Sequence, residues 1–425
     1  MTTALLTDHY ELTMLQAALR SGAAHRRSVF EMFARRLPGG RRYGVVAGTR
    51  RALDAIAEFH FDDADLTFLA AQRVVDDATL EYLAGYAFAG DVSGYAEGEA
   101  FFPGSPLMVV EGTFAEAVLL ETVLLSVYNH DCAIASAASR MTTVAGERPC
   151  IEMGSRRTHE EAAVAAARAA VLAGFAASSN LEAGRRYGVP TTGTSAHAFT
   201  LLHDDEAAAF RAQVDALGVG TTLLVDTYDV VEGIRTAVEV AGPGLGAIRL
   251  DSGDLPTLAR AARRQLDELG ADGTRVLVTS DLDEFAISGL MAAPVDGYGV
   301  GTSLVTGSGA PTAGMVYKLV QRDGVPVAKR SEGKNSTGGR KSAVRRHDAD
   351  GTAVAEVVTS GRVEPRDGDR QLVVPLVRGG EPVTPSSPAE ALAAAAAHHR
   401  RVREALPAEA WALSRGEPVL ETVGS

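Results

Sequence analysis

The segment Ile248–Leu255 places one cation and two carboxylates in a turn that follows a short apolar run. Arg249, Asp251 and Asp254 flank a Ser-Gly pair, and a helical pattern begins immediately afterwards. A strand, a charged turn and a helix in this order are typical of parallel α/β proteins, which carry their chemistry at the carboxyl ends of strands. The turn is therefore the first candidate for a functional site.

Five further apolar runs end in polar or glycine-containing clusters. The clusters are Met153–Arg157, Gly193–His197, Asp226–Asp229, Thr279–Glu284 and Gly299–Ser303, and they follow strands predicted at 150–153, 190–194, 222–225, 275–278 and 297–300. Because the carboxyl ends of the strands of a barrel converge, we expect all six clusters to contribute to one site.

The residue types in these clusters suggest an anionic ligand. Gly299, Gly301 and Thr302 offer backbone N–H groups and a hydroxyl, which suit a phosphate at a turn. Arg156 and Arg157 offer planar guanidinium groups for phosphate or carboxylate. The chain has a net charge of −13, so local arginines must overcome an unfavourable overall field if the ligand is anionic.

Carboxylates and one histidine complete the set. Asp251, Asp254, Asp281 and Asp283 could hold ribose hydroxyls or Mg²⁺, and His197 could act as acid, base or nucleophile. Each residue also has a purely structural interpretation, because aspartates before helices are often N-caps and isolated histidines are often structural hydrogen-bonding groups. Their coincidence on six strand ends favours a site for a phosphorylated sugar with Mg²⁺.

From about residue 149, the predicted strands and helices that position these residues alternate regularly along the chain. Helical patterns at 159–176, 204–216, 230–240 and 255–269 separate the strands, and a seventh strand is predicted at 314–320. We expect an α/β fold, an irregular (β/α) barrel with a smaller α/β domain built from both chain ends. The predicted division is 1–110 and 326–425 for the smaller domain and 111–325 for the barrel, which carries the site.

Bulk properties limit the function classes. The acidic balance argues against nucleic-acid or membrane binding, and no apolar run long enough for a transmembrane helix is present. The N-terminus lacks the pattern of a signal peptide, and Cys132 and Cys150 have no metal-type spacing, so we expect free thiols and a cytoplasmic location.

The basic segment 329–346 is not a Walker A loop and is expected to be a mobile basic loop, either solvated or closing over anions. Ser387 and Glu390 predict a capping box that begins a C-terminal helix.

Seven motifs in this order resemble the nicotinate phosphoribosyltransferase family. They are TDHYELTM, EMGSRR, GTSAHAF, DTYD, RLDSGDL, TSDLDE and GVGTSLVT, and the resemblance runs from about residue 5 to about residue 345. The resemblance implies an enzyme that makes nicotinate mononucleotide and pyrophosphate from nicotinate and 5-phosphoribosyl 1-pyrophosphate, coupled to ATP hydrolysis. It also implies a homodimer with sites near the subunit interface, and ATP and Mg²⁺ as cofactors.

The resemblance also implies roles for individual residues. By motif, His197 matches a histidine that ATP phosphorylates, Arg249 an arginine near the base and phosphates, and Asp251 an aspartate near the ribose. Tyr10 matches a tyrosine that packs on the pyridine ring, from its own or the neighbouring subunit. The predicted substrate-binding residues are Tyr10, Met153, Gly154, Arg156, Ser179, Ser252, Asp254, Ser280, Asp281, Gly299, Gly301 and Thr302, and Asp254 is also the predicted metal ligand.

Two positions bear on the choice of base. Related enzymes that use the amide carry an aspartate where this chain has Ser179, and a serine there favours the acid because it can donate to a carboxylate. The family often has an aromatic residue where this chain has Met153, which can still pack against a ring.

Three alternatives remain. They are the same reaction with nicotinamide or quinolinate as the base, a phosphosugar aldolase or isomerase, and an inactive binding barrel. No lysine precedes Lys318, which argues against an aldolase that needs a barrel lysine.

Overall fold

The computed structural model describes residues 2–329 and 337–424, and the chain divides into two compact units. The terminal unit comprises Met1–Ser136 and Ala310–Ser425, and the central unit is Ala137–Gly309. The boundaries predicted from sequence lie near residues 111 and 325. The difference arises because strands just inside those limits pair with an N-terminal strand rather than with the central sheet.

The terminal unit is built on an antiparallel sheet that, in the described part of the chain, has seven strands in the order β13-β12-β1-β5-β3-β17-β18. Their bounds are β1 Arg27–Ala34, β3 Asp91–Gly94, β5 Met108–Thr113, β12 Met315–Arg322, β13 Val325–Pro326, β17 Val374–Arg378 and β18 Glu381–Pro382. The prediction of a seventh barrel strand at 314–320 was wrong, because β12 pairs antiparallel with β1. Its Tyr317 stacks on Phe30 with a ring-centroid distance of 4.9 Å, which buries both rings in the core of this unit.

Smaller sheets and several helices complete the terminal unit. The strands are β2 Gly44–Val45 with β4 Ala100–Phe101, and β14 Lys341–His347, β15 Ala353–Ser360, β16 Arg370–Gln371 and β19 Thr422–Gly424 in a second sheet. The helices are α1 His9–Ser21, α2 Thr49–Ala57, α3 Asp63–Ala71, α4 Asp77–Ala84, α5 Phe114–Val118 and α15 Pro388–Glu404, and α6 Glu121–Ala145 runs on into the central unit. The predicted capping box of Ser387 and Glu390 is confirmed at the start of α15. Of the basic segment 329–346, residues 330–336 lie outside the described residues.

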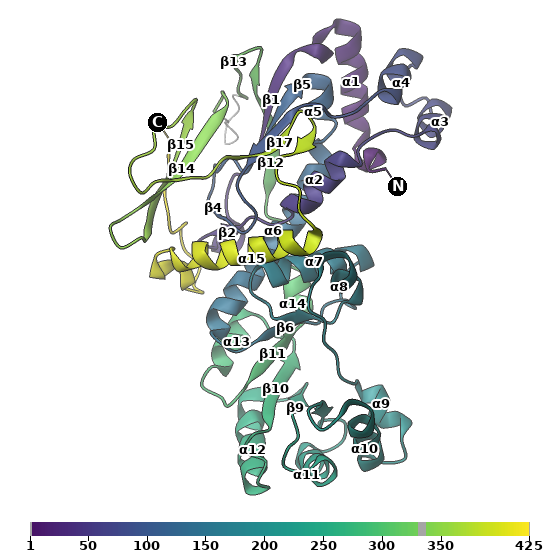
Figure 1. Ribbon diagram of the computed structural model, residues 1–425, viewed down its shortest axis with the longest axis vertical. Coiled ribbons are helices and arrows are strands. Elements are labelled where there is room, and N and C mark those ends of the chain that lie inside the picture. Colours follow the sequence, from purple (N-terminus) through teal and green to yellow (C-terminus); the bar gives the residue numbers. More distant parts are fainter. Residues whose placement is uncertain (1, 330–336, 425) are drawn as a thin grey trace. The chain divides into compact units, whose positions relative to one another are not determined.

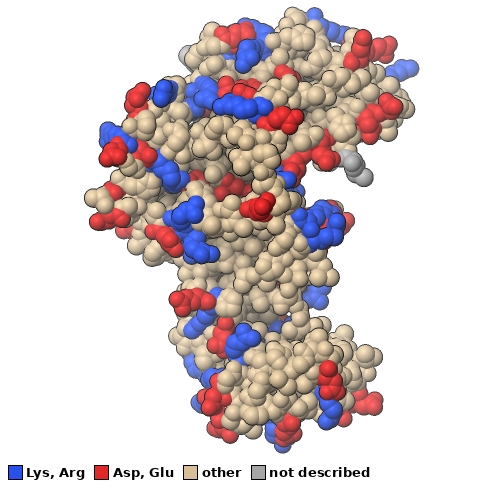
Figure 2. All heavy atoms as spheres, viewed as in Figure 1, with Lys and Arg blue, Asp and Glu red and all other residues tan. Residues whose placement is uncertain are grey.

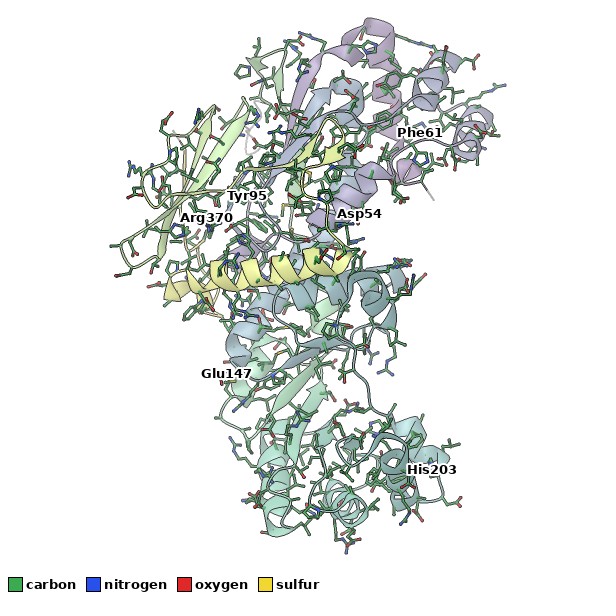
Figure 3. The ribbon with its side chains drawn as sticks, in the orientation of Figure 1. Asp54, Phe61, Tyr95, Glu147, His203 and Arg370 are labelled. Carbon is green, nitrogen blue, oxygen red and sulfur yellow. The ribbon has the colours of Figure 1, made fainter. Side chains whose placement is uncertain are left out.

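Buried ion pairs join the two chain ends inside the terminal unit. Lys341 Nζ on β14 lies 2.6 Å from Glu31 on β1, and Arg345, which lies 2.6 Å from Glu356 on β15, also lies 3.5 Å from Glu99 in the N-terminal part of the chain. Glu356 also accepts a hydrogen bond from the hydroxyl of Tyr95, which Figure 3 labels beside the strands of the second sheet. These contacts explain why segments more than 200 residues apart form one core.

The central unit contains a parallel sheet with the order β7-β6-β11-β10-β9-β8 (Figure 1). Its strands are β6 Cys150–Glu152, β7 Ala177–Ser178, β8 Thr222–Leu224, β9 Ala247–Leu250, β10 Arg275–Ser280 and β11 Gly297–Val300. Within residues 137–309, all of which the structure describes, no strand pairing joins β8 to β7. The sheet is therefore a half-barrel, more open than the closed barrel that seven or eight units would form.

One predicted barrel strand was wrong. Residues 190–194 have no strand of their own and only an isolated bridge joins Thr191 to Ser178, whereas β7 was not predicted from the sequence. Pro190 lacks the N–H that a ladder needs, which favours a loop over a strand here. The loop nevertheless runs beside β7, because Ser178 donates its N–H to the Pro190 carbonyl and Thr192 donates to that of Ser178.

Helices cover the parallel sheet, and aspartates begin four of them. The helices are α7 Glu160–Leu172, α8 Leu181–Tyr187, α9 His197–Leu202, α10 Glu206–Leu217, α11 Val230–Ala241, α12 Leu255–Glu268, α13 Glu284–Leu290 and α14 Thr302–Val305. Asp205, Asp229, Asp254 and Asp283 each accept a backbone N–H in the first turn of α10, α11, α12 and α13. These four aspartates therefore act as N-caps.

Among the described residues, one helical stretch, Phe114–Ala145, is long and apolar enough to cross a membrane by length and composition. Because 67% of the most apolar part of this stretch is buried inside the protein, it resembles the core helix of a globular protein. On the face shown in Figure 2, acidic and basic side chains are interspersed rather than gathered by sign.

Candidate active site

The parallel strands carry most of the predicted site residues to one edge of the central sheet. Asp251 follows β9, Ser280 ends β10, Gly301 follows β11 and Met153 follows β6. Because all these strands run in the same direction, their carboxyl ends meet at that edge.

His197 lies at the start of α9 among three polar side chains. Its Nδ1 is 3.1 Å from Thr227 Oγ1, and its Nε2 is 3.9 Å from both Asp226 Oδ1 and Asp251 Oδ2. The His197 side chain is 41% exposed, so a ligand from solvent can reach the ring. Carboxylates on one side of an imidazole orient the ring, as proton or group transfer requires.

Asp226 is the residue that sequence reasoning named within DTYD but assigned no role. Its side chain is only 2% exposed, and its Oδ2 accepts hydrogen bonds from the Asp251 N–H at 2.8 Å and from the Ser252 hydroxyl at 3.2 Å. Its other oxygen, Oδ1, is buried and has no hydrogen-bond partner in the described residues. The signal was available, because Asp226 directly follows an apolar strand while Asp229 supplies the cap of α11.

Asp251 is held from two sides. Its Oδ1 accepts a hydrogen bond from the Thr279 hydroxyl of β10, and its backbone N–H is bound to Asp226. The remaining oxygen, Oδ2, is the one that lies toward His197. Two neighbouring strands thus fix the direction of this carboxylate, which makes a preorganised acceptor.

Arg249 on β9 is a half-buried cation whose Nη1 donates to Thr194 Oγ1 at 3.3 Å. Its Nε is buried without a hydrogen-bond partner in the described part of the chain. Burial lowers the pKa of the Arg249 guanidinium, the carboxylates of Asp251 and Asp226 oppose that change, and the nearby charge of Arg156 adds to it. An unsatisfied buried donor of this kind favours an anionic ligand.

Arg249 lines a small cavity of about 50 Å³ together with Met153 and Gly299, two other predicted residues. A Cβ on Gly299 would clash with Thr279 Cγ2 and lie 2.8 Å from Met153 Sδ, so only glycine fits there. The remaining lining residues are Ile151, Thr192, Gly193, Thr194, Thr222, Leu277, Thr279 and Tyr298. The cavity is largely apolar apart from Arg249 and threonine hydroxyls. Its apolar wall suits an aromatic ring, and Arg249 suits a carboxylate on that ring.

The three remaining residues of the glycine-containing turns have different surroundings. A Cβ on Gly154 would clash with Val305 Cγ1, so packing alone requires glycine at that position. A Cβ on Gly301 would approach no atom closer than the Met153 carbonyl oxygen at 3.5 Å, which leaves space above the turn. Thr302 begins α14 and is half-buried.

In the turns after β9 and β10, one polar residue caps a helix and two are exposed to solvent. Asp254 caps α12, and its two carboxylate oxygens accept from the backbone N–H and the hydroxyl of Thr257. Ser280 is exposed and has a backbone φ of 155°, a conformation that L-residues rarely adopt and that often occurs at functional sites. Asp281 beside it is exposed, as a ligand contact would require.

Arg156 and Ser179 are both exposed at the β6–β7 side of the sheet. No hydrogen bond or ion pair fixes the Arg156 side chain among residues 2–329 and 337–424. Ser179 donates its backbone N–H to the Glu152 carbonyl at 2.8 Å, which leaves its hydroxyl for a ligand. The adjacent Ser178 hydroxyl is used within the protein by the buried Glu152 carboxylate.

A second titratable residue near the site has no sequence signal. Burial, with the nearby charges of Asp226 and Asp229, raises the pKa of the Glu206 carboxyl to about 7. Glu206 is the first residue of α10, and its Oε1 is buried without a hydrogen-bond partner in the described residues. Burial is the main cause of this shift, and the charges of Asp226 and Asp229 add to it.

Tyr10 belongs to the terminal unit, where it lies in the first turn of α1 with 44% of its surface exposed. Its predicted contact with a ring bound in the central unit stays a prediction. Within the described residues, no group of three or more His, Cys, Asp or Glu side chains is preformed as a metal site.

A parallel α/β half-barrel that gathers a buried arginine, two carboxylates and a histidine at its strand ends defines an α/β-barrel enzyme acting on an anionic ligand. Residues 5–129 match the family described as the nicotinate phosphoribosyltransferase (NAPRTase) N-terminal domain.

Whole-chain comparisons extend this match. The chain is 62% identical over 431 residues to nicotinate phosphoribosyltransferase pncB1 of Mycobacterium tuberculosis, covering 98% of this chain and 94% of that protein. It is 39% identical over 372 residues to nicotinate phosphoribosyltransferase of Bacillus subtilis, covering 83% and 76%. The crystal structure of human nicotinic acid phosphoribosyltransferase superposes with a TM-score of 0.83 at 27% identity, covering 99% and 97%. This chain belongs to the nicotinate phosphoribosyltransferase family.

Proposed function

We propose that the chain transfers the phosphoribosyl group of 5-phosphoribosyl 1-pyrophosphate to nicotinate, driven by phosphorylation of His197 by ATP. The products are nicotinate mononucleotide and pyrophosphate, and ATP becomes ADP and phosphate. Family membership supports the transfer, which is a salvage step of NAD biosynthesis. The position of His197, with its Nε2 3.9 Å from two carboxylates, is the observation that carries the coupling to ATP.

The transfer needs little proton chemistry from the protein. The ring nitrogen of nicotinate has its own lone pair and attacks C1 of the ribose, while the bond from C1 to pyrophosphate breaks and its electrons leave with pyrophosphate. Asp251 stabilises the positive charge that develops on the sugar, and Arg249 and Arg156 stabilise negative charge on the ligands. The fixed direction of the Asp251 carboxylate supports this role, because a preorganised group costs no reorganisation during the reaction.

His197 takes the phosphoryl group from ATP on a ring nitrogen, and water later releases it as phosphate. Asp226 supports this role because its buried carboxylate lies 3.9 Å from Nε2, where it stabilises the positive charge that develops on the ring as a ring nitrogen takes the phosphoryl group. The phosphorylated ring then brings negative charge toward Asp226 and Asp251, so a cation is needed beside them.

The donor set at this edge of the sheet fits Mg²⁺. Asp226 Oδ1 is a buried oxygen without a partner in the described residues, and Asp251 Oδ2 lies on the same side of His197. Hard carboxylate oxygens are the ligands that Mg²⁺ prefers, and the bound ion would neutralise charge on the phosphate groups. Asp254, the metal ligand predicted from sequence, is a weaker candidate because Thr257 uses both of its oxygens.

Two residues of the cavity, together with Ser179 outside its lining, select the base. The Arg249 guanidinium and the Ser179 hydroxyl are donors for a carboxylate, and Met153 packs against the ring. Gly301 and Thr302 receive the 5-phosphate, with Gly299 and Gly154 supporting the turns, and Ser252, Ser280 and Asp281 contact the ribose or pyrophosphate. Tyr10 covers the pyridine ring in a homodimer, from its own or the partner subunit.

The proposed setting follows from these ligands. Nicotinate, 5-phosphoribosyl 1-pyrophosphate and ATP are small molecules of central metabolism, so we propose a cytoplasmic enzyme without a nucleic-acid or membrane partner. The net charge of −13 supports the absence of non-specific nucleic-acid binding.

One assay tests the activity and the coupling together. Purified protein with nicotinate, 5-phosphoribosyl 1-pyrophosphate and Mg²⁺ should form nicotinate mononucleotide faster with ATP than without it. The His197→Ala variant should keep the slow ATP-independent rate and lose the acceleration, because no nitrogen remains to be phosphorylated. His203→Ala is the matched control: His203, which Figure 3 labels, directly follows the last residue of α9 and should leave the acceleration intact. Product masses and rates are measured by liquid chromatography with mass detection.

The same assay with nicotinamide tests the base. A protein that uses both bases equally would contradict the role of Ser179 and Arg249 in selecting the acid. A protein that makes no product from either base would be the inactive binding barrel instead.

A further inference from the structure

Glu11 is a buried carboxyl group at the junction of α1 and α6 in the terminal unit. The residue has no exposed surface, although it lies directly after the exposed Tyr10. Its Oε1 accepts hydrogen bonds from the backbone N–H of Thr122 at 3.0 Å and from the Thr122 hydroxyl at 2.6 Å. Thr122 is the second residue of α6, so Glu11 satisfies one of the unpaired N–H groups at the start of that helix.

The same threonine also interacts with Tyr10. Burial raises the pKa of the Tyr10 hydroxyl to about 12, the charge of Glu121 adds to the rise, and a side-chain hydrogen bond with Thr122 opposes it. A side-chain hydrogen bond from Tyr10 likewise lowers the pKa of Glu121, the first residue of α6. Tyr10 therefore lies beside the first turn of α6, and Glu11 is bonded to that same turn through Thr122.

We propose that Glu11 is a positioning residue for nicotinate: by holding Thr122 at the start of α6, it fixes the first turn of α1 and hence the Tyr10 ring. This inference rests on the proposed contact between Tyr10 and the pyridine ring. Glu11 itself is buried and touches no ligand. Its effect is transmitted through Thr122 and the backbone of α1.

The anchor depends on pH. Burial raises the pKa of Glu11 to about 7, the charges of Glu121 and Asp8 add to the rise, and the Thr122 hydrogen bonds oppose it. The charged and titratable groups around it are Asp8 and Tyr10 at the start of α1, Glu121 on α6, and Tyr317 and Lys318 on β12, with Lys318 Nζ 3.8 Å from Glu121. Glu11 Oε2 is buried and has no hydrogen-bond partner in the described residues. Ionisation strengthens the Thr122 hydrogen bonds but places a buried charge beside Glu121 and Asp8, and the net rise in pKa shows that the second effect is larger, so the first turn of α1 is less stable once Glu11 ionises above neutral pH.

Four variants separate this inference from a general effect on stability. Glu11→Ala removes the anchor, Glu11→Gln keeps the shape and one acceptor oxygen, and Tyr10→Ala removes the ring. The control is Glu116→Gln, because Glu116 Oε2 accepts from the Thr113 N–H at 2.8 Å and its hydroxyl at 2.6 Å, which is the same pair of contacts at the start of α5. Each full-length variant is assayed between pH 6 and 9 for kcat and for the Michaelis constants of nicotinate and of the phosphoribosyl donor, with thermal melting as a check of folding.

We expect Glu11→Ala to raise the KM for nicotinate about tenfold, the scale of one lost aromatic contact. We expect kcat and the KM for the phosphoribosyl donor to change less than about twofold. In the wild-type protein the KM for nicotinate should rise above neutral pH, whereas in Glu11→Gln it should stay low and flat. Glu116→Gln should keep the wild-type pH profile.

The outcomes distinguish the proposed Tyr10 contact from the role of Glu11. A Tyr10→Ala variant with unchanged KM for nicotinate would overturn the Tyr10 contact and the inference with it. If Tyr10→Ala raises that KM while Glu11→Ala and the Glu11→Gln pH profile match the wild type, the inference alone fails. If Glu11→Ala does not fold, the Glu11→Gln profile decides.

Discussion

At the scale of single residues, a buried carboxylate behind the exposed residues holds the site together. Asp226 is nearly inaccessible, yet it contacts the Asp251 backbone, the Ser252 hydroxyl and the surroundings of His197. The histidine could be predicted from sequence because the GTSAHAF motif carries it. Asp226 could have been singled out because it directly follows a strand, but its contacts with Asp251 and Ser252 could not be predicted, because they depend on the pairing of β8 with β9.

Asp226→Asn tests this assignment. The amide keeps the shape and one acceptor oxygen for Asp251 but loses the charge beside His197, so ATP-dependent phosphorylation should fall by about 100-fold, the scale of a lost acid–base partner. Asp229→Asn is the control, since asparagine caps helices as well as aspartate does and should leave phosphorylation and melting unchanged. Labelled phosphate retained by the protein from ATP is the measurement. Equal losses in both variants would show that any nearby carboxylate serves.

At the scale of elements, the parallel strands and their helices could be predicted because apolar runs and aspartate caps recur along the chain. Strands at 150–153, 222–225, 246–250, 275–278 and 297–300 are confirmed, whereas the strand at 190–194 was wrong and the two-residue β7 was missed. A two-residue strand has no periodicity to detect, and its pairing with β6 is set by the sheet. The strand predicted at 314–320 exists, but it joins the terminal sheet and not the barrel, because the hydrophobic period of a strand does not determine which sheet it joins.

Asp254 separates capping from metal binding. Asp254→Ala should lower the free energy of unfolding by about 1 kcal/mol, because α12 loses the acceptor for the Thr257 N–H. Asp254→Asn should restore the stability, and its Mg²⁺ concentration for half-maximal activity should match the wild type. Urea denaturation and a Mg²⁺ titration of the assay measure the two quantities. A weakened Mg²⁺ response in the asparagine variant would restore Asp254 as a metal ligand.

At the scale of the whole molecule, the terminal unit depends on contacts between segments that are far apart in sequence. β12, β14 and β17 come from the C-terminal part of the chain and complete a sheet or core begun by β1 and β3. The composition of both ends predicted a shared domain, but the partners of its buried charges could not be predicted. A buried arginine and a buried glutamate leave no periodic pattern, and only the fold pairs them.

Arg345 shows how strongly these contacts hold the terminal unit. Its guanidinium is 1% exposed, lies 2.6 Å from Glu356 and 3.5 Å from Glu99, and stacks over the Phe102 ring. Arg345→Met should cost about 3–5 kcal/mol of unfolding free energy, because it leaves Glu356 buried without its cation.

Two further variants make this expectation specific. Adding Glu356→Gln should recover part of the loss, because the uncompensated charge is then removed. Arg378→Met, which breaks the exposed pair with Asp91 at 2.8 Å, should cost no more than about 1 kcal/mol. Urea midpoints at neutral pH give the three values, and similar losses for Arg345→Met and Arg378→Met would contradict the view that the buried pair matters more for stability than the exposed one.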